Sequence, residues 1–101
     1  MSRNATKTVQ IFRHIVKARR IIVDNCGEDI RPYALRLWLS AYVNQINQNY
    51  NASSPEILEL NAECRTLLKR ERKNIPFLIR RQQIAAYLIL YAPWLHRLVY
   101  G

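Results

Sequence analysis

Glycine and cysteine are both scarce in this chain of 101 residues. Its two glycines, Gly27 and Gly101, and its four prolines supply too few turns for the many short strands of an all-β protein. Two isolated glycines also exclude a glycine-rich loop that cradles phosphates. The two cysteines form no CxxC or Cys/His cluster, so the sequence argues against structural zinc and a disulfide scaffold, and we expect reduced thiols.

Acidic residues are few, and none of them is arranged for catalysis. The seven Asp and Glu residues are scattered along the chain. His14 and His96 lie in different predicted helices, and neither has an obvious acid or nucleophile as a neighbour. The sequence therefore predicts a protein that is not an enzyme and that has no metal site.

Long apolar runs are missing as well. The longest candidate, Ile84 to Leu95, is interrupted by Pro93 and is shorter than the roughly 18 residues that a spanning helix needs. We therefore expect no membrane span. Residues 1–23 contain six basic residues and no acid, a composition shared by mitochondrial import sequences and by ordinary basic helices.

The chain has a large excess of positive charge. Sixteen Lys and Arg against seven Asp and Glu give a net charge of +9. Such a balance favours an acidic partner, which can be nucleic acid, anionic lipid or an acidic protein.

Apolar spacing predicts an all-α fold built on an antiparallel three-helix bundle over residues 1–73. The first helix, 5–24, has a stripe of Val9, Phe12, Val16 and Val23 that Ile11, Ile15 and Ile22 broaden. The second starts near residue 30 with Pro32 in its first turn and has the stripe Leu35, Trp38, Leu39, Tyr42 and Ile46. The third follows a capping box at Ser53 and Glu56, and its face is formed by Ile57, Leu60, Cys64, Leu67 and Leu68.

Residues 74–101 have a different character. Asn74-Ile75-Pro76 interrupts the pattern, Phe77 to Tyr91 resumes as a helix that is apolar over most of its girth, and Pro93 should kink it. We expect a hydrophobic C-terminal helix that docks on a larger assembly, with a fourth bundle helix as the alternative. The expected docking residues are Phe77, Ile84, Leu88, Tyr91 and Trp94.

A second basic cluster follows the third helix. Its members are Arg65, Lys69, Arg70, Arg72, Lys73, Arg80 and Arg81, offset by Glu71 alone. It has three readings: solvated surface, contact with the phosphates of RNA or DNA, and steering toward an acidic protein. A membrane-surface role for the C-terminal helix, with Arg80 and Arg81 among lipid headgroups, is a further alternative.

Three segments in order resemble the LYR-motif (Complex1_LYR-like) family of small mitochondrial adaptor proteins. Ile11-Phe12-Arg13, followed by Ile15-Val16-Lys17, is similar to the Leu-Tyr-Arg opening of the family. Tyr33-Ala34-Leu35-Arg36 resembles its Tyr-Ala-Val-Arg segment, with Tyr42 at the aromatic position beyond. Ser54-Pro55-Glu56-Ile57 with Leu60 resembles the start of its third helix, one residue short in spacing.

The resemblance implies a non-catalytic accessory subunit or assembly factor of the mitochondrial matrix or the matrix side of the inner membrane. Such a protein binds the strongly acidic acyl carrier protein and anchors it to a respiratory complex, the ATP synthase, the mitoribosome or the cysteine desulfurase. The implied carrier-binding residues are Phe12, Arg13, Lys17, Arg36 and Tyr42. The main alternative is a small basic helical protein that binds nucleic acid.

By the same resemblance the chain binds no cofactor directly but shelters the acyl-phosphopantetheine chain of its partner. The tunnel between the helices would be lined, besides Phe12 and Tyr42, by Val9, Val16, Leu35, Leu39, Leu60, Cys64 and Leu67. An ordinary closed core is the alternative for these apolar residues. The chain departs from the family after Tyr42, where Val43 to Gln48 contains no basic residue, so carrier binding could be weakened.

Overall fold

The chain is mostly helical in the computed structural model, which describes residues 2–49 and 54–100. In order, the elements are α1 (Ser2–Asn25), α2 (Arg31–Gln48), α3 (Pro55–Arg70), the 3₁₀ helix η1 (Arg72–Phe77), α4 (Arg80–Tyr91) and α5 (Pro93–Tyr100). The all-α prediction is confirmed, and no strand occurs within the described ranges. No helix in the described part of the chain combines the length and the apolar character needed to cross a membrane.

Prolines mark the beginnings of three helices. Pro32, Pro55 and Pro93 each stand in the first turn, where the missing N–H would have no helical partner. Pro76 instead lies inside η1, the short 3₁₀ segment that replaces the interruption expected at residues 74–76. Of the predicted capping box, Ser53 lies outside the described residues, and the Glu56 carboxylate accepts a hydrogen bond from Thr6 Oγ1 at 2.8 Å.

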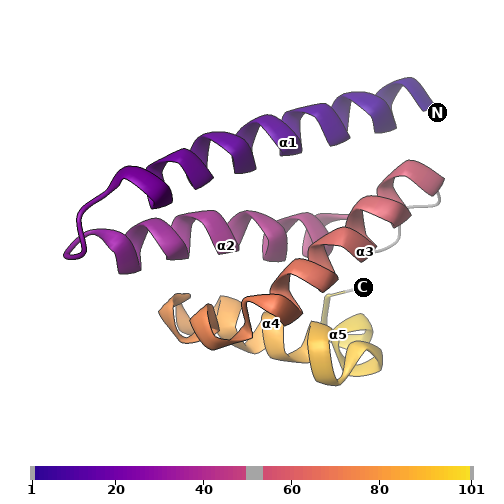
Figure 1. Ribbon diagram of the computed structural model, residues 1–101. Helices are drawn as coiled ribbons and strands as arrows, with labels where there is room; N and C mark the ends of the chain where they lie inside the picture. The colour runs from indigo at the N-terminus through magenta and orange to yellow at the C-terminus, as the bar shows by residue number, and fades with distance from the viewer. Residues whose placement is uncertain (1, 50–53, 101) are drawn as a thin grey trace.

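The first three helices alternate in direction along the chain (Figure 1). α1 and α2 lie side by side and antiparallel, and α3 packs against both of them at an angle. η1 and α4 pack against α2 and α3, on the side of α2 away from α1. The molecule is therefore flat, with principal extents of 42 × 30 × 18 Å.

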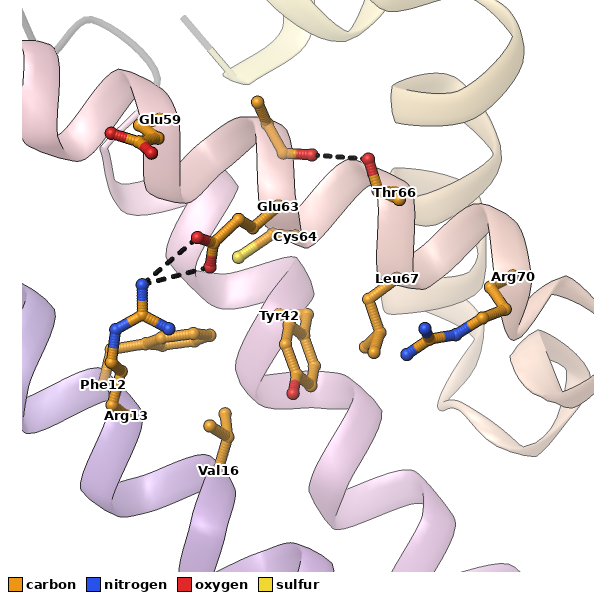
Figure 2. A pocket seen from close by; sticks show the side chains of 11 residues that line it. Phe12, Arg13, Val16, Tyr42, Glu59, Glu63, Cys64, Thr66, Leu67 and Arg70 are labelled. Carbon is orange, nitrogen blue, oxygen red and sulfur yellow. Dashed lines mark hydrogen bonds and ion pairs between the residues drawn. The ribbon is translucent and has the colours of Figure 1, made fainter.

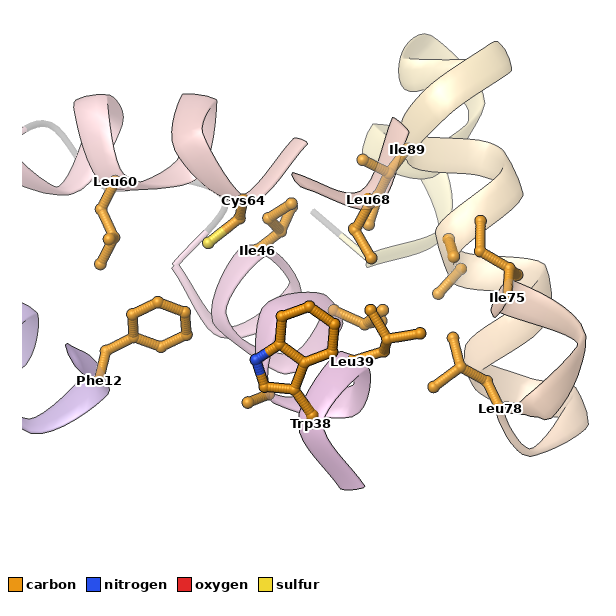
Figure 3. Packing of buried hydrophobic residues seen from close by; sticks show 14 of the residues in the cluster. Phe12, Trp38, Leu39, Ile46, Leu60, Cys64, Leu68, Ile75, Leu78 and Ile89 are labelled. Carbon is orange, nitrogen blue, oxygen red and sulfur yellow. The ribbon is translucent and has the colours of Figure 1, made fainter. Parts of the chain in front are cut away.

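One buried cluster connects these helices (Figure 3). Leu39 and Val43 of α2 are fully buried in this cluster, which also includes residues of α1, α3, η1 and α4. The remaining large members include Phe12, Val23, Trp38, Ile46, Leu60, Cys64, Leu68, Ile75, Leu78 and Ile89. The core thus draws on both sides of residue 73, because Ile75, Leu78 and Ile89 belong to the segment expected to dock elsewhere.

The helix α4 combines the two behaviours expected from the sequence, those of a fourth bundle helix and of an exposed docking helix. Ala85, Ala86 and Ile89 are buried against the core, as a fourth bundle helix requires. Ile84, Tyr87 and Tyr91 remain exposed on the opposite side. Because two small alanines face the core, α4 can approach α2 and α3 closely, while Ile84, Tyr87 and Tyr91 face solvent.

Candidate functional site

A groove runs between α1 and α3, with α2 as its floor (Figure 2). It consists of two adjoining cavities of about 460 and 570 Å³ that share Arg13, Val16, Tyr42, Leu67 and Arg70. We call it the α1/α3 groove. Its full lining is Phe12, Arg13, Val16, Lys17 and Arg20 from α1, Trp38 and Tyr42 from α2, and Glu59, Ala62, Glu63, Cys64, Thr66, Leu67, Arg70 and Glu71 from α3 and its end.

Three aromatic rings build the floor. Phe12 and Trp38 each meet the ring of Tyr42 edge to face, with centroid distances of 5.3 and 5.6 Å. Such edge-on contacts suit the ring quadrupoles and hold Tyr42 in one orientation. In Figure 2 the Tyr42 ring lies between Val16 and Leu67, in the middle of the groove. Burial raises the pKa of Tyr42 above its ordinary value of 10.0, so its hydroxyl is neutral and adds no charge to the floor.

The thiol of Cys64 is the second polar group of the floor. Cys64 is fully buried, and burial first, followed by the negative charge of Glu63, raises the pKa of its thiol to about 12. A thiol with that pKa is protonated at neutral pH, and only the thiolate is a strong nucleophile. Cys64 therefore acts as a small apolar residue at the groove and not as a reactive group.

Cations form the rim, and two of them already have partners. Arg13 Nη2 lies 3.2 Å from Glu63 Oε2 and joins α1 to α3 across the groove. Arg20 pairs with Asp24 at 3.2 Å, and its guanidinium stands 4.6 Å from the Trp38 ring centroid. Both ion pairs are about half exposed and are therefore worth about 1 kcal/mol or less.

Lys17 and Arg70 are the rim cations left for an incoming ligand. Both are exposed, and within the residues that the structure describes neither forms an ion pair. They stand on opposite walls, Lys17 on α1 and Arg70 on α3. An anionic group placed over the groove can therefore meet positive charge from both sides.

The structure brings together most of the residues that the resemblance assigns to a carrier protein. Phe12, Arg13, Lys17 and Tyr42 all line the α1/α3 groove. Arg36 does not lie with them. Its Nε donates to the Phe77 carbonyl at 2.7 Å and its guanidinium stands 5.6 Å from the Tyr33 ring centroid, so it holds η1 against α2.

The residues expected to line an acyl tunnel are divided between groove and core. Val16, Cys64 and Leu67 line the groove. Leu39 and Leu60 are 0% and 1% exposed and belong to the packed core. The two others, Val9 and Leu35, are half-buried against that core, and Leu35 also lines a separate cavity beside Val23 and Phe77. Of the seven residues that the resemblance assigns to a tunnel, three thus line an open groove and four pack in or against the core.

Four of the five expected docking residues are accessible. Phe77, Ile84, Tyr91 and Trp94 are exposed, whereas Leu88 is half-buried. Their exposure leaves an apolar surface along η1, α4 and α5.

Two of the cations in the groove are not singled out for this site by the sequence. Arg20 and Arg70 were assigned only to basic clusters, yet both line the groove. Arg70 lies three residues after Leu67 on the same helix, and that spacing places the two side by side. A helical projection of the third helix could have indicated it.

No matches were found in comparisons with protein-family models, with curated proteins or with solved structures. Within residues 2–49 and 54–100, no group of three or more His, Cys, Asp or Glu side chains is placed to hold a metal ion.

Proposed function

We propose that the chain is a non-catalytic, LYR-type mitochondrial accessory subunit or assembly factor that binds an acyl carrier protein through the α1/α3 groove. It would anchor that carrier to a larger complex: a respiratory complex, the ATP synthase, the mitoribosome or the cysteine desulfurase. The matrix, or the matrix side of the inner membrane, is the proposed location. The observation that carries the proposal is the clustering of Phe12, Arg13, Lys17 and Tyr42 in one groove.

The charge of the groove supports an acidic protein as the partner. Lys17 and Arg70 offer positive charge on opposite walls, and the whole chain has a net charge of +9. An acidic helix laid along the rim would be attracted over a distance of about 8 Å at physiological salt and then held in register by close contacts. The carboxylates of Glu59, Glu63 and Glu71 oppose this attraction on the α3 side, so we expect the partner's acids to gather toward α1.

The floor of the groove supports an apolar group attached to that partner. Val16, Leu67 and the Tyr42 ring form an apolar wall, and the neutral Cys64 thiol adds no charge. Each methylene group transferred from water to such a wall contributes about 0.8 kcal/mol. An acyl chain carried on phosphopantetheine could therefore lie in the groove while the cations above it contact the carrier and the phosphate.

The second partner would contact η1 and the start of α4. Phe77 and Ile84 are 37% and 52% exposed there, although both belong to elements packed on the core. This surface and the α1/α3 groove have no residue in common. One molecule can therefore hold a carrier and a larger complex at the same time.

Calorimetric titration with a purified acyl carrier protein tests the proposal. We expect the dodecanoyl-phosphopantetheinyl form to bind, and the apo form, which lacks the prosthetic group, to bind at least about tenfold more weakly because no acyl chain is buried. The double variant Lys17→Glu with Arg70→Glu places negative charge on both walls and should weaken binding at least about tenfold.

Lys7→Glu is the matched control for this titration. Lys7 is exposed on the same helix as Lys17, but it does not line the groove. Its charge reversal should change the affinity by less than about twofold. Failure of the acylated carrier to bind the native chain, or equal weakening by the control, would remove the carrier from the proposal.

A nucleic-acid-binding protein is the second candidate, because the whole basic cluster from Arg65 to Arg81 is exposed. On duplex DNA, each phosphate contact should add about 0.9 to the log–log slope of affinity against salt. Fluorescence anisotropy with labelled RNA and duplex DNA measures the affinity and its dependence on salt. The double variant Arg72→Glu with Lys73→Glu should weaken this binding. Undetectable binding at low salt would eliminate this candidate.

A further inference from the structure

The end of α4 and the helix α5 carry four strongly exposed apolar side chains. Tyr91, at the end of α4, is 65% exposed, and on α5 Trp94, Leu98 and Val99 are 67%, 76% and 61% exposed. Solvation of so much apolar surface on one short segment is unfavourable, and soluble proteins usually reserve such patches for binding. We call these four residues the α5 patch.

A buried contact fixes the direction in which α5 faces. His96 is 1% exposed, and its Nε2 lies 2.7 Å from Asn47 Oδ1 of α2. Trp94 and Leu98 stand two residues before and two after His96, so a helical turn places them on the opposite side. The contact of His96 thus directs Trp94 and Leu98 away from the core.

The charged residues that follow Glu71 in the chain are all basic. From Arg72 to the end of the chain there are five basic residues and no acidic residue. Arg97 lies on α5 itself, and Arg80 and Arg81 begin α4; all three are exposed. This segment would therefore attract an acidic surface, because it contains no Asp or Glu side chain that would repel one.

We propose that the α5 patch binds the surface of an anionic lipid bilayer, with α5 lying in the plane of the membrane interface. Trp and Tyr have an apolar ring and a polar edge, which suits the boundary between headgroups and acyl chains. Arg97 reaches the phosphates while Leu98 and Val99 enter the apolar layer. Eight residues span about 12 Å, far short of the roughly 30 Å of the bilayer core, so α5 lies on the membrane.

The α5 patch suits a bilayer surface better than the other exposed apolar stripe, on α1, does. On α1, Ile11, Ile15 and Ile22 are also exposed, but they are branched aliphatic residues without an aromatic neighbour on that face. The α5 patch combines two aromatic rings, two aliphatic residues and an arginine on the same short segment. That composition is typical of helices that bind the membrane interface.

The proposal is independent of carrier binding, because the α5 patch and the α1/α3 groove have no residue in common. Its test uses the full chain and vesicles of phosphatidylcholine, with or without phosphatidylglycerol. We expect partition onto the anionic vesicles at least about tenfold stronger than onto the neutral ones, falling as salt is raised. Trp38 is 4% exposed in the core, so quenching by brominated lipids should report Trp94.

Leu98→Asp should weaken partition at least about tenfold, because it places a charge in the apolar layer. It should not disturb folding, since Leu98 is 76% exposed. Ile11→Asp is the matched control on α1 and should leave partition unchanged within about twofold. The proposal is overturned if the native chain does not bind anionic vesicles, or if both variants weaken binding equally. It is also overturned if the chain binds by charge alone, so that Trp94 is not quenched and Leu98→Asp has no effect.

Discussion

Replacement of Leu39 by alanine is expected to lower the free energy of unfolding by about 3 kcal/mol. Leu39 is 0% exposed and belongs to the same buried cluster as Trp38 and Leu78 (Figure 3). It belongs to α2, the helix that packs against α1, α3, η1 and α4. A cavity at this point weakens the packing of α2 against its neighbours, and a domain of this size is stable by only about 5–15 kcal/mol.

Urea unfolding followed by far-ultraviolet circular dichroism measures the change. Leu37→Ala is the matched control, because it removes the same atoms from the same helix at a side chain that is 42% exposed. We expect that control to cost less than about 1 kcal/mol. Equal losses for the two variants would contradict the placement of α2 at the centre of the fold.

The helical fold could be predicted because each helix repeats its apolar residues at helical spacing. The spacing also indicated the correct inner face of α1, since Phe12 and Val23 are buried and Val9 and Val16 pack against the core. It overestimated the width of that face. Ile11, Ile15 and Ile22 were expected to broaden the buried stripe, yet they are 50%, 39% and 46% exposed. In this flat molecule, other helices pack against α1 on one side only. The spacing of apolar residues within α1 does not indicate how many helices will pack against it.

The groove was partly predictable for the same reason. Arg13 and Lys17 stand four residues apart on one helix, so their common face follows from the period alone. The position of Arg36 does not follow from it. Its partner, the carbonyl of Phe77, is 41 residues away and depends on how η1 folds back on α2. Contacts between residues so far apart in the sequence depend on tertiary packing, which the spacing of apolar residues does not predict.

His96 is the clearest example of a role that the sequence did not suggest. It was expected to be one more residue of an exposed docking segment, but it is buried against Asn47, 49 residues earlier in the chain. This contact gives α5 its orientation, and it also makes the orientation sensitive to acid.

Acidification is expected to release α5 from the rest of the molecule. Burial, followed by the positive charge of Arg65, lowers the pKa of His96 below its ordinary value of 6.5. Because the released state binds a proton more readily than the packed state, the stabilisation is fully present above pH 6.5 and is lost as the pH falls toward the lowered pKa. Within that window, the protection of α5 amides against hydrogen exchange should fall by up to about tenfold for each pH unit.

Hydrogen exchange followed by mass spectrometry, corrected for the intrinsic rate at each pH, measures this release. His96→Gln keeps an N–H donor for Asn47 Oδ1 but does not titrate, so its α5 amides should lose no protection between pH 7.5 and pH 5. His14→Gln is the second control, because His14 is exposed on α1 and should leave the native response intact. A native response that survives in His96→Gln would show that another group controls α5. Loss of the response in His96→Gln alone would assign it to this histidine, and with it the control of whether the α5 patch faces outward.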